Sequence, residues 1–383
     1  MEDLELLTKF RRDLHRIPEL SFDLPETIRY VRNVLAGLSC EVTEPCESCV
    51  CAYFDVDEAC GRAASGPATA IRADMDALPI TENSGVSFCS TKPGHMHACG
   101  HDGHMAMALA AACWVNDVLV QVRAGAACPL PRNVLFVFQP AEETTGGART
   151  VCESGVFERY RVDRIFGFHV WPDLPAGVVA TRPGPLLARA SETHVTIHGT
   201  SSHIAKSADG HDALLAGAHF LTGVEALMAE LSAEEPCLLK FGLIQSGTVC
   251  NAISAQTQIA GSLRVFSDEM FDRARAGVER CAREACEPYG CTYDLDFADG
   301  YPPVTNDAAL YGLAKDALGG VLELVPEPLL IAEDFAFYQR HLPGLFMLLG
   351  TGTGIPLHSD EFRMDEDVLV HGLETYRALL QCE

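Results

Sequence analysis

Short apolar runs that end in charged residues, proline or glycine recur along the chain. They begin near residues 68 (ATAIRAD), 133 (NVLFVFQ), 164 (RIFGFHVW) and 344 (GLFMLLG). Runs of this kind are typical of strands that are buried on both faces of a sheet. Helical patterns lie between them, most clearly at 103–119. Strands that alternate with helices predict an α/β fold, with helices on both faces of the sheet and functional groups where the strands end.

The stretch from about residue 187 to residue 298 has a different pattern, in which apolar and polar residues alternate. Alternation with a period of two is typical of strands that have one face in solvent. The expected elements are strands at 192–203, 239–247, 255–266 and 291–297, and helices at 212–231 and about 268–286. This order predicts an α+β sandwich of the ferredoxin-like type, with one open sheet face.

The length of the chain also favours two domains. Its 383 residues exceed the size at which a single hydrophobic core usually stops growing. We therefore predict an α/β domain formed by residues 1–186 and 299–383, with residues 187–298 inserted into it as a second domain.

Composition and charge argue against nucleic acid and membranes as partners. The 53 acidic residues outnumber the 28 basic ones and give a formal charge of −25, whereas a nucleic-acid binder needs a basic footprint. No apolar run reaches the roughly 18 residues that span a bilayer, so we expect no membrane partner. The N-terminus lacks the basic start and apolar core of a signal peptide. We expect there a surface helix that buries Leu4, Leu7, Phe10 and Leu14, and we expect a cytoplasmic protein.

The 16 cysteines are too sparse for a disulfide scaffold, so we expect mostly reduced thiols. Cys46, Cys49 and Cys51 include one CxxC pair. No second Cys/His pair follows at zinc-site spacing, which favours partly buried strand thiols over a metal site there.

The densest candidate chemistry lies in GHMHACGHDGH at 94–104, a glycine-bounded turn before a helix. Its possible ligands are His95, His97, Cys99, His101, Asp102 and His104. Thiolate and imidazole are ligands of borderline-soft metals such as zinc. Residues two apart in an extended turn can face one ion, which fits Cys99 and His101. A solvated histidine-rich loop is the alternative.

A pair of carboxylates ends the strand at FQPAEE. Burying Glu142 and Glu143 unpaired would be costly. The cost is resolved if one carboxylate binds metal and the other is a general base for a metal-activated water. An exposed acidic turn is the alternative, and it fits poorly after the apolar run LFVFQP.

Two further histidines follow other strands. His169 stands alone in the apolar strand GFHVW, where a histidine is more often a core residue than a ligand, and His358 lies in PLHSDEF. Together with Cys99, His101 and Glu143, they would supply five ligands for two ions that share a bridging water.

At this point the sequence resembles a known family, the amidohydrolase branch of a large group of two-metal peptidases. Its members include bacterial aminoacylases, hippurate hydrolases and plant auxin-conjugate amidohydrolases. The resemblance extends from about residue 8 to 366. It is carried by eleven ordered motifs: RRDLHRIPELSF, IRADMDALPI, HACGHDGHMAMAL, FQPAEE with a GGA soon after, GFHV, HGTSSH, NAIS, GSLR, AEDFAFY, PGLFMLLG and LHSDEF.

The resemblance implies roles for individual residues of the α/β domain. It makes Glu142 the general base and Asp76 an acid that orients the metal site. The metal ligands that it implies are Cys99, His101, Glu143, His169 and His358. They would hold two divalent ions, either zinc, manganese, cobalt or nickel, and the thiolate favours the softer ones.

In the insertion, the resemblance implies a lid that usually dimerises. His203 would stabilise the oxyanion across a homodimer or higher homo-oligomer, and Asn251 and Arg264 would hold the substrate. From the residues alone, His203 and Arg264 would be interpreted as strand-surface groups. The run IAKSADGHDAL after HGTSSH departs from many relatives, and Lys206 and Asp209 within it bear on specificity.

The expected function is metal-dependent hydrolysis of the amide bond in an N-acyl amino acid or a similar small conjugate. A dipeptidase or carboxypeptidase with the same metal centre is the alternative within hydrolases. A catalytically silent binding protein is the alternative from another class, and the presence of every matched catalytic residue disfavours it.

Overall fold

The computed structural model describes residues 2–62, 66–144 and 146–383. Within them the chain forms two compact units. The first comprises the residues up to Gly184 together with Thr305–Pro326 and Asp334–Glu383, and the second comprises Pro185–Val304 and Glu327–Glu333. The predicted insertion at 187–298 falls inside the second unit.

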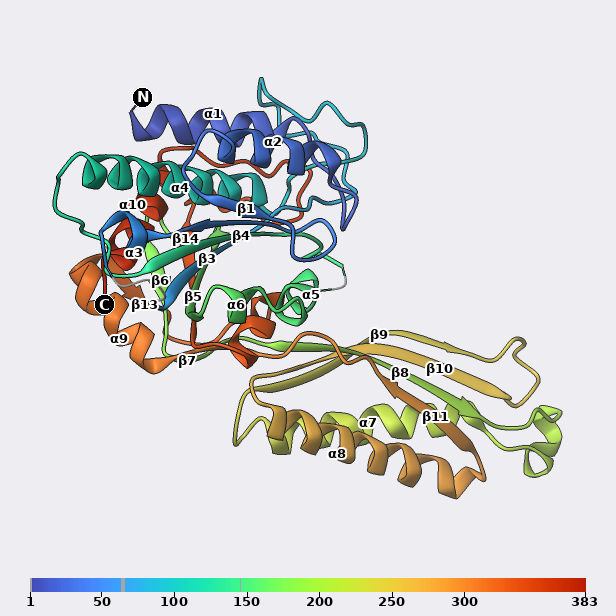
Figure 1. Ribbon diagram of the computed structural model, residues 1–383. Helices are drawn as coiled ribbons and strands as arrows, with labels where there is room; N and C mark the ends of the chain where they lie inside the picture. Colours follow the sequence, from blue (N-terminus) through green and yellow to red (C-terminus); the bar gives the residue numbers. More distant parts are fainter. Residues whose placement is uncertain (1, 63–65, 145) are drawn as a thin grey trace. The chain divides into compact units, whose positions relative to one another are not determined.

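The first unit is built on a sheet of eight strands in the order β1-β2-β4-β3-β5-β14-β6-β13 (Figure 1). The strands are β1 (Glu41–Thr43), β2 (Val50–Phe54), β3 (Ala68–Asp74), β4 (Asn133–Gln139), β5 (Val162–Trp171), β6 (Val179–Thr181), β13 (Leu322–Leu324) and β14 (Gly344–Gly350). The four central strands β4, β3, β5 and β14 are parallel to one another. Every residue of β3, β4 and β14 is buried, as the apolar runs predict.

Helices cover the sheet of the first unit. They are α1 (Asp3–His15), α2 (Pro25–Leu35), α3 (Val56–Ala59), α4 (His101–Arg123), α5 (Gly147–Glu153), α6 (Val156–Arg159), α9 (Ala308–Leu318) and α10 (Val368–Leu380), with 3-10 turns η3 (Gly319–Val321) and η4 (Asp334–Arg340). In Figure 1, α1, α2 and α4 lie on one side of the sheet, and α5 and α6 lie on the other. The prediction of an α/β fold with helices on both faces is confirmed.

The second unit contains a four-stranded antiparallel sheet in the order β11-β8-β10-β9. Its elements are β8 (Arg189–His198), η1 (Ile204–Asp209), α7 (Ala213–Leu231), β9 (Cys237–Ser246), β10 (Gln256–Val265), α8 (Asp268–Cys286), η2 (Glu287–Tyr289) and β11 (Thr292–Phe297). Strands β7 (Gly184–Leu187) and β12 (Val304–Asn306) lie where the chain passes between the units.

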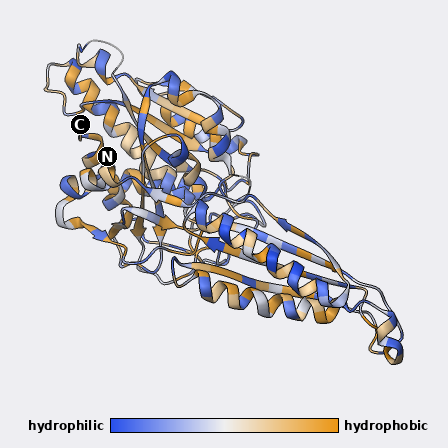
Figure 2. Ribbon diagram, turned by 90° about the horizontal axis from the view of Figure 1, so that it is seen from below, coloured by the Kyte–Doolittle hydropathy of each residue, from blue (hydrophilic) through white to orange (hydrophobic). Residues whose placement is uncertain are grey.

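The two long helices of the second unit pack on its sheet through apolar side chains. Val195 and Ile197 of β8 are buried with Phe220 of α7 and Val278 of α8. The residues that alternate with them on β8 are more exposed, as a half-exposed strand requires. Figure 2 shows the matching mixture of hydrophobic and hydrophilic residues along the helices. This is the α+β sandwich that the alternating segments predict.

The N-terminal helix differs from the prediction in one respect. Leu7, Phe10 and Leu14 are buried, whereas Leu4 is 38% exposed. The buried face of α1 instead includes Arg11 and His15. Charge pairing within the first unit explains their burial: both side chains contact the carboxylate of Asp102, at 3.2 and 2.8 Å.

Two helices of the described chain, α4 and α7, are long and apolar enough to cross a membrane by length and composition alone. Helix α4 belongs to the hydrophobic core of the first unit, and α7 belongs to that of the second. Core packing therefore accounts for the apolar character of both.

The expectation of mostly reduced thiols agrees with the structure, in which a single pair of the described cysteines is bonded. Cys60 and Cys128 form a disulfide between the end of α3 and the segment that precedes β4, and the other cysteines are free.

Candidate metal centre and active site

The predicted ligands of the first unit meet where its central strands end. The turn after β4 carries Glu142 and Glu143, His169 lies near the end of β5, and His358 follows β14. Cys99 stands just before α4. Because β4, β3, β5 and β14 are parallel neighbours, their carboxyl ends share one edge of the sheet, and segments far apart in sequence converge there.

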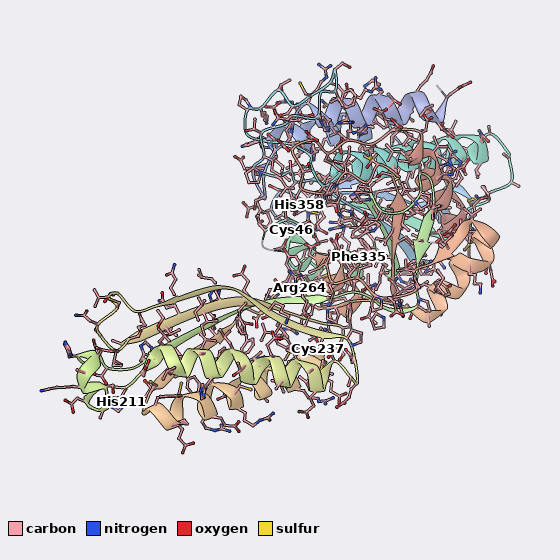
Figure 3. All side chains as sticks on the ribbon, turned by 180° about the vertical axis from the view of Figure 1, so that it is seen from behind. Cys46, His211, Cys237, Arg264, Phe335 and His358 are labelled. Carbon is pink, nitrogen blue, oxygen red and sulfur yellow. A yellow bond between two sulfur atoms is a disulfide. The ribbon has the colours of Figure 1, made fainter. Side chains whose placement is uncertain are left out.

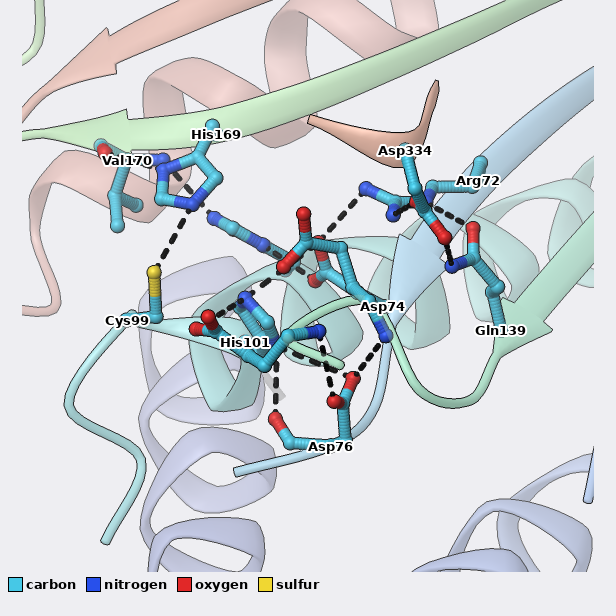
Figure 4. Close-up of polar contacts among 12 residues, drawn as sticks. Arg72, Asp74, Asp76, Cys99, His101, Gln139, His169, Val170 and Asp334 are labelled. Atoms are coloured by element: carbon cyan, nitrogen blue, oxygen red, sulfur yellow. Dashed lines mark hydrogen bonds and ion pairs between the residues drawn. The ribbon is translucent and has the colours of Figure 1, made fainter. Parts of the chain in front are cut away.

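The thiol of Cys99 lies at the middle of the cluster. Its Sγ is 3.3 Å from Nε2 of His169 and 3.3 Å from Nε2 of His358. Nε2 of His358 is in turn 3.3 Å from Oε1 of Glu143. Figure 4 shows His169 and Cys99 facing each other across the site.

Hydrogen bonds orient the two buried imidazoles toward the cluster. Nδ1 of His101 donates to the backbone oxygen of Asp76 at 2.8 Å, and Nδ1 of His169 donates to that of Val170 at 2.7 Å. Each bond leaves the Nε2 lone pair free, which is the arrangement that a metal-binding histidine needs. Burial lowers the pKa of His169 to about 3, so this ring is neutral and able to act as a ligand.

The charges of the site also suit a cation. Burial alone would raise the pKa of Glu143, but the hydrogen bond and the charge of His358 favour its ionised form and help to lower the pKa, so the group is a carboxylate. Burial, followed by the nearby charges of Glu143 and Glu142, raises the pKa of Cys99 well above its ordinary value. A thiolate at this position therefore needs a positive partner.

A buried ligand atom without a partner shows that the site fits a metal. Nε2 of His101 is buried and makes no hydrogen bond, which is costly unless another group satisfies it. Two triplets of ligand atoms each lie within 4.8 Å of one another: Cys99, His101 and His169 form one, and Cys99, Glu143 and His358 form the other. Nitrogen, sulfur and carboxylate oxygen are the donors that zinc and similar ions take, so the cluster fits a metal.

Asp76 fixes the turn that carries the carboxylate pair. Its Oδ1 accepts the backbone N–H of Glu142 at 2.9 Å, and its Oδ2 accepts that of Glu143 at 3.1 Å. Glu142 is buried, and its carboxylate lies within 4.8 Å of ligand atoms of His101 and Glu143. The carboxylate that we predict to be the general base is thereby held at a defined place beside the predicted metal ligands.

Residues whose supporting role we did not predict surround the predicted ligands. Nδ1 of His104 donates to Asp74 at 2.6 Å, and its Nε2 accepts the backbone N–H of Val170 at 2.9 Å, next to His169. Arg72, Asp74 and Asp76 alternate in RADMD, which places their side chains on one side of an extended chain, but this spacing does not indicate His104 as the partner of Asp74.

A second supporting network joins four segments near the site. The fully buried guanidinium of Arg72 contacts Asp74 at 2.7 Å and Asp334 at 2.8 Å. Asp334 also accepts hydrogen bonds from the side chain of Gln139 at 2.7 Å and from the backbone of Ala148 at 2.9 Å. Figure 4 shows these groups beside the ligands. The motif AEDFAFY contains Asp334, but nothing in its spacing indicates the partners.

Not every polar residue of the 94–104 turn faces the ligands. Asp102 pairs with Arg11 and His15. His97 is buried with no hydrogen bond to either ring nitrogen, and burial lowers its pKa to about 3. Of the six candidates in this turn, Cys99 and His101 are the two found in the triplets around the thiol.

The residues predicted to contact substrate belong to the second unit. His203 is exposed and precedes η1, and its bridge with Ala252 places it beside Asn251, whose backbone oxygen accepts from Ile204. Arg264 lies on β10, and burial lowers its pKa (Figure 3). Their roles remain predictions.

Comparison with known proteins agrees with this architecture. Residues 70–381 match the model of Peptidase family M20/M25/M40. The chain belongs to this family. It is therefore a metal-dependent hydrolase, with a buried cluster of side chains suited to metal.

Relatives match the chain over nearly its whole length. A probable hydrolase of Synechocystis is 36% identical, with 97% of this chain and 94% of that protein covered. A putative aminohydrolase from methicillin-resistant Staphylococcus aureus has a similar crystal structure, with a TM-score of 0.88, 29% identity, and coverage of 99% of this chain and 96% of that one. The Bacillus subtilis YXEP protein, described as a dinuclear metal-binding peptidase of the M20 family, gives a TM-score of 0.83 at 32% identity, with coverage of 99% and 97%.

Proposed function

We propose that the protein hydrolyses the amide bond of small N-acyl amino acids or similar conjugates, using two divalent ions and Glu142 as general base. The observation that carries this proposal is the anchoring of Glu142 by Asp76 directly beside the donors grouped around Cys99. The dinuclear site of the Bacillus subtilis neighbour supports the number of ions. The aminohydrolase description of the Staphylococcus structure supports the class of bond.

The two triplets suggest how the chain would hold the ions. Cys99, His101 and His169 would bind one, and Cys99, Glu143 and His358 would bind the other, so that the thiolate is common to both. Divalent ions at such a centre make water acidic near neutral pH and polarise the bond to be cut.

The protein's own residues would then move the protons. Glu142 takes a proton from the attacking water and delivers it to the nitrogen of the leaving amine. Asp76 holds the backbone of Glu142 and Glu143 throughout, so that base and ligand keep their spacing. Burial of Glu142 excludes bulk water, which would compete for the same proton.

We assign substrate contacts to the second unit. His203 would donate a hydrogen bond to the oxyanion, Asn251 would bind the substrate, and Arg264 would pair with its carboxylate. We also propose a homodimer or higher homo-oligomer that forms through this unit, in which the exposed Leu243 and Ile244 of edge strand β9 supply an apolar contact.

A substrate panel tests the proposal. Metal-stripped protein is reloaded with zinc, manganese, cobalt or nickel and offered N-acetyl and N-benzoyl amino acids, an indole-acetyl conjugate and unblocked dipeptides. Metal-dependent cleavage of the N-acyl compounds alone is the expected result. Cleavage of the dipeptides alone would identify a dipeptidase, and no cleavage with any metal would favour a binding protein.

A further inference from the structure

Three cysteines outside the metal centre gather around the turn between β1 and β2. Cys46 is partly exposed, whereas Cys49 and Cys51 are fully buried. Figure 3 labels Cys46 on the first unit. None of the three takes part in the proposed hydrolysis, and the Cys60–Cys128 disulfide does not include them.

The backbone brings Cys46 and Cys49 close together. The N–H of Cys49 donates to the oxygen of Cys46 at 3.2 Å, which closes a four-residue turn. Such a turn holds its first and last Cα atoms within about 7 Å, and disulfides join Cα atoms about 4.4–6.8 Å apart. Ser48, the third residue of the turn, has φ of 56° and is tied by its hydroxyl to the oxygen of Phe22.

The thiols of this turn have unequal character. A hydrogen bond from Cys49 outweighs burial and, with a further bond to Thr150, lowers the pKa of Cys46 to about 7. The Sγ of Cys46 lies 3.6 Å from the hydroxyl of Thr150. Cys49 has its pKa raised well above the ordinary value by its contacts with Cys46 and Cys51 and by burial, and its Sγ is 3.8 Å from that of Cys51. The exposed member is thus the nucleophile, and the buried one stays protonated behind it.

We propose that Cys46 and Cys49 form a reversible redox pair, which a hydroperoxide oxidises to a disulfide through initial attack by Cys46. The Cys46 thiolate attacks the terminal oxygen of the hydroperoxide. The O–O bond breaks, the sulfur becomes a sulfenic acid, and the other oxygen leaves and is protonated to an alcohol or water. The Cys49 sulfur then attacks the Cys46 sulfur, and the S–S bond forms as the hydroxyl and the Cys49 proton leave as water. Two electrons pass from the thiols to the peroxide, and a small dithiol reverses the change.

The third thiol gives the proposal an internal control. Cys51 contacts Cys49 but lies on the other side of it in sequence, on β2. Cys51 supports the protonated Cys49 and is not a partner in the disulfide. Replacement of Cys51 therefore leaves the pair able to oxidise, whereas replacement of Cys49 does not.

Peptide mapping of the full chain shows whether Cys46 and Cys49 become linked by a disulfide. The protein is treated with a stoichiometric amount of hydrogen peroxide, its remaining thiols are alkylated, and it is digested without reductant by a glutamyl endopeptidase. Because Glu47 lies between Cys46 and Cys49, cleavage leaves the two cysteines on separate peptides that a disulfide alone would hold together. The expected product is the linked pair of peptides, which dithiothreitol separates.

Matched variants sharpen the test. Cys51→Ser should still give the linked peptides, whereas Cys49→Ser should leave a sulfenic acid on Cys46 that dimedone traps. In the unmodified sequence, Cys46 should be oxidised about threefold faster than the exposed Cys89 and Cys250, since a larger thiolate fraction is partly offset by lower nucleophilicity. Circular dichroism of each variant checks that the fold is retained.

Several outcomes would overturn the proposal. Cys46 and Cys49 could be recovered on separate, alkylated peptides, or the link could instead involve Cys51 or another cysteine. Protection of all three thiols by added zinc, with no disulfide after peroxide, would identify a metal site. Thiol oxidation and peptide linkage are measured without hydrolysis. A failure of the redox proposal therefore leaves the proposed function unaffected, and a failure of the proposed function leaves the redox proposal unaffected.

Discussion

The backbone N–H of Glu142 donates to Oδ1 of Asp76 at 2.9 Å, although 66 residues separate them in the chain. The other oxygen of the same carboxylate accepts the N–H of Glu143. One side chain at the end of β3 therefore sets the position of two carboxylates at the end of β4. The spacing between the proposed base and the proposed metal ligand depends on this connection between neighbouring strands.

Asp76→Asn should weaken the centre without unfolding the protein. The amide of asparagine has a single acceptor oxygen, so one of the two backbone N–H groups loses its hydrogen-bond partner. The NH₂ group of the asparagine then faces that N–H group, and both are donors. We expect metal affinity to fall about 10- to 100-fold, as when other groups that orient metal ligands are replaced. Titration of metal-free protein with zinc measures the change. Asp173→Asn, at an exposed site, is the control, and equal affinities for the two variants would contradict the role of Asp76.

Glu142→Gln should leave the metal content unchanged, whereas Glu143→Gln should lower it. Glutamine at 142 keeps the shape of the side chain but cannot accept the proton of water, so we expect kcat to fall about 10²- to 10⁴-fold with both ions retained. Glutamine at 143 removes a charged ligand and should reduce the bound metal. Elemental analysis alongside kinetics distinguishes the two. Substantial activity in the Glu142 variant would remove it from the mechanism.

Removal of metal should destabilise the first unit. The buried Nε2 of His101 has no hydrogen-bond partner, so an ion satisfies an atom that is otherwise costly to bury. An ion present at one hundred times its Kd stabilises the folded state by about 2.7 kcal/mol. Calorimetry should show a lower Tm after chelation and recovery on reloading. In His358→Ala the shift should shrink, and an unchanged Tm in the parent protein would contradict the metal assignment.

His15 should make stability depend on pH. Burial alone would lower its pKa, but the charge of Asp102 and hydrogen bonds to Asp102 and Glu82 raise it to about 9. A histidine with a raised pKa contributes stability that is complete below its unfolded pKa of about 6.5 and is lost as the pH rises through the folded value. His15→Asn should therefore cost more free energy of unfolding at pH 6 than at pH 9.5. Urea unfolding of this variant and of the exposed His341→Asn at both pH values checks the difference, and a cost independent of pH would argue against the charged pair.

The residues that converge in the candidate metal centre could be named from the sequence because each stands beside a strong local pattern. His169 interrupts an apolar strand, and Glu142 and Glu143 close another, so the chemistry is visible where a strand ends. The networks of Arg72 with Asp334 and of His104 with Val170 could not be predicted in the same way. Their partners come from strands whose order is set by tertiary packing, and no local spacing encodes that order.

The burial of Arg11 and His15 shows the same limit. An amphipathic pattern predicts which apolar residues face the core, but a charged residue is buried only when a matching charge arrives from another element. Here Asp102 supplies it, from the first turn of α4. Leu4 is exposed although it fits the apolar pattern, because periodicity does not show how far the covering elements extend.

His358, which follows β14, is separated from Cys99 by 259 residues, and their side chains meet at 3.3 Å. During synthesis, Cys99, His101 and His169 leave the ribosome long before His358, which completes the group of Cys99, Glu143 and His358. The strand that leads to His358 also belongs in the middle of the sheet, between β5 and β6. A nascent chain therefore lacks both the last donor and a central part of its scaffold. The second group of donors can therefore form only after β14 has taken its place between β5 and β6, and a chain cut short before β14 would lack both that strand and the last proposed ligand.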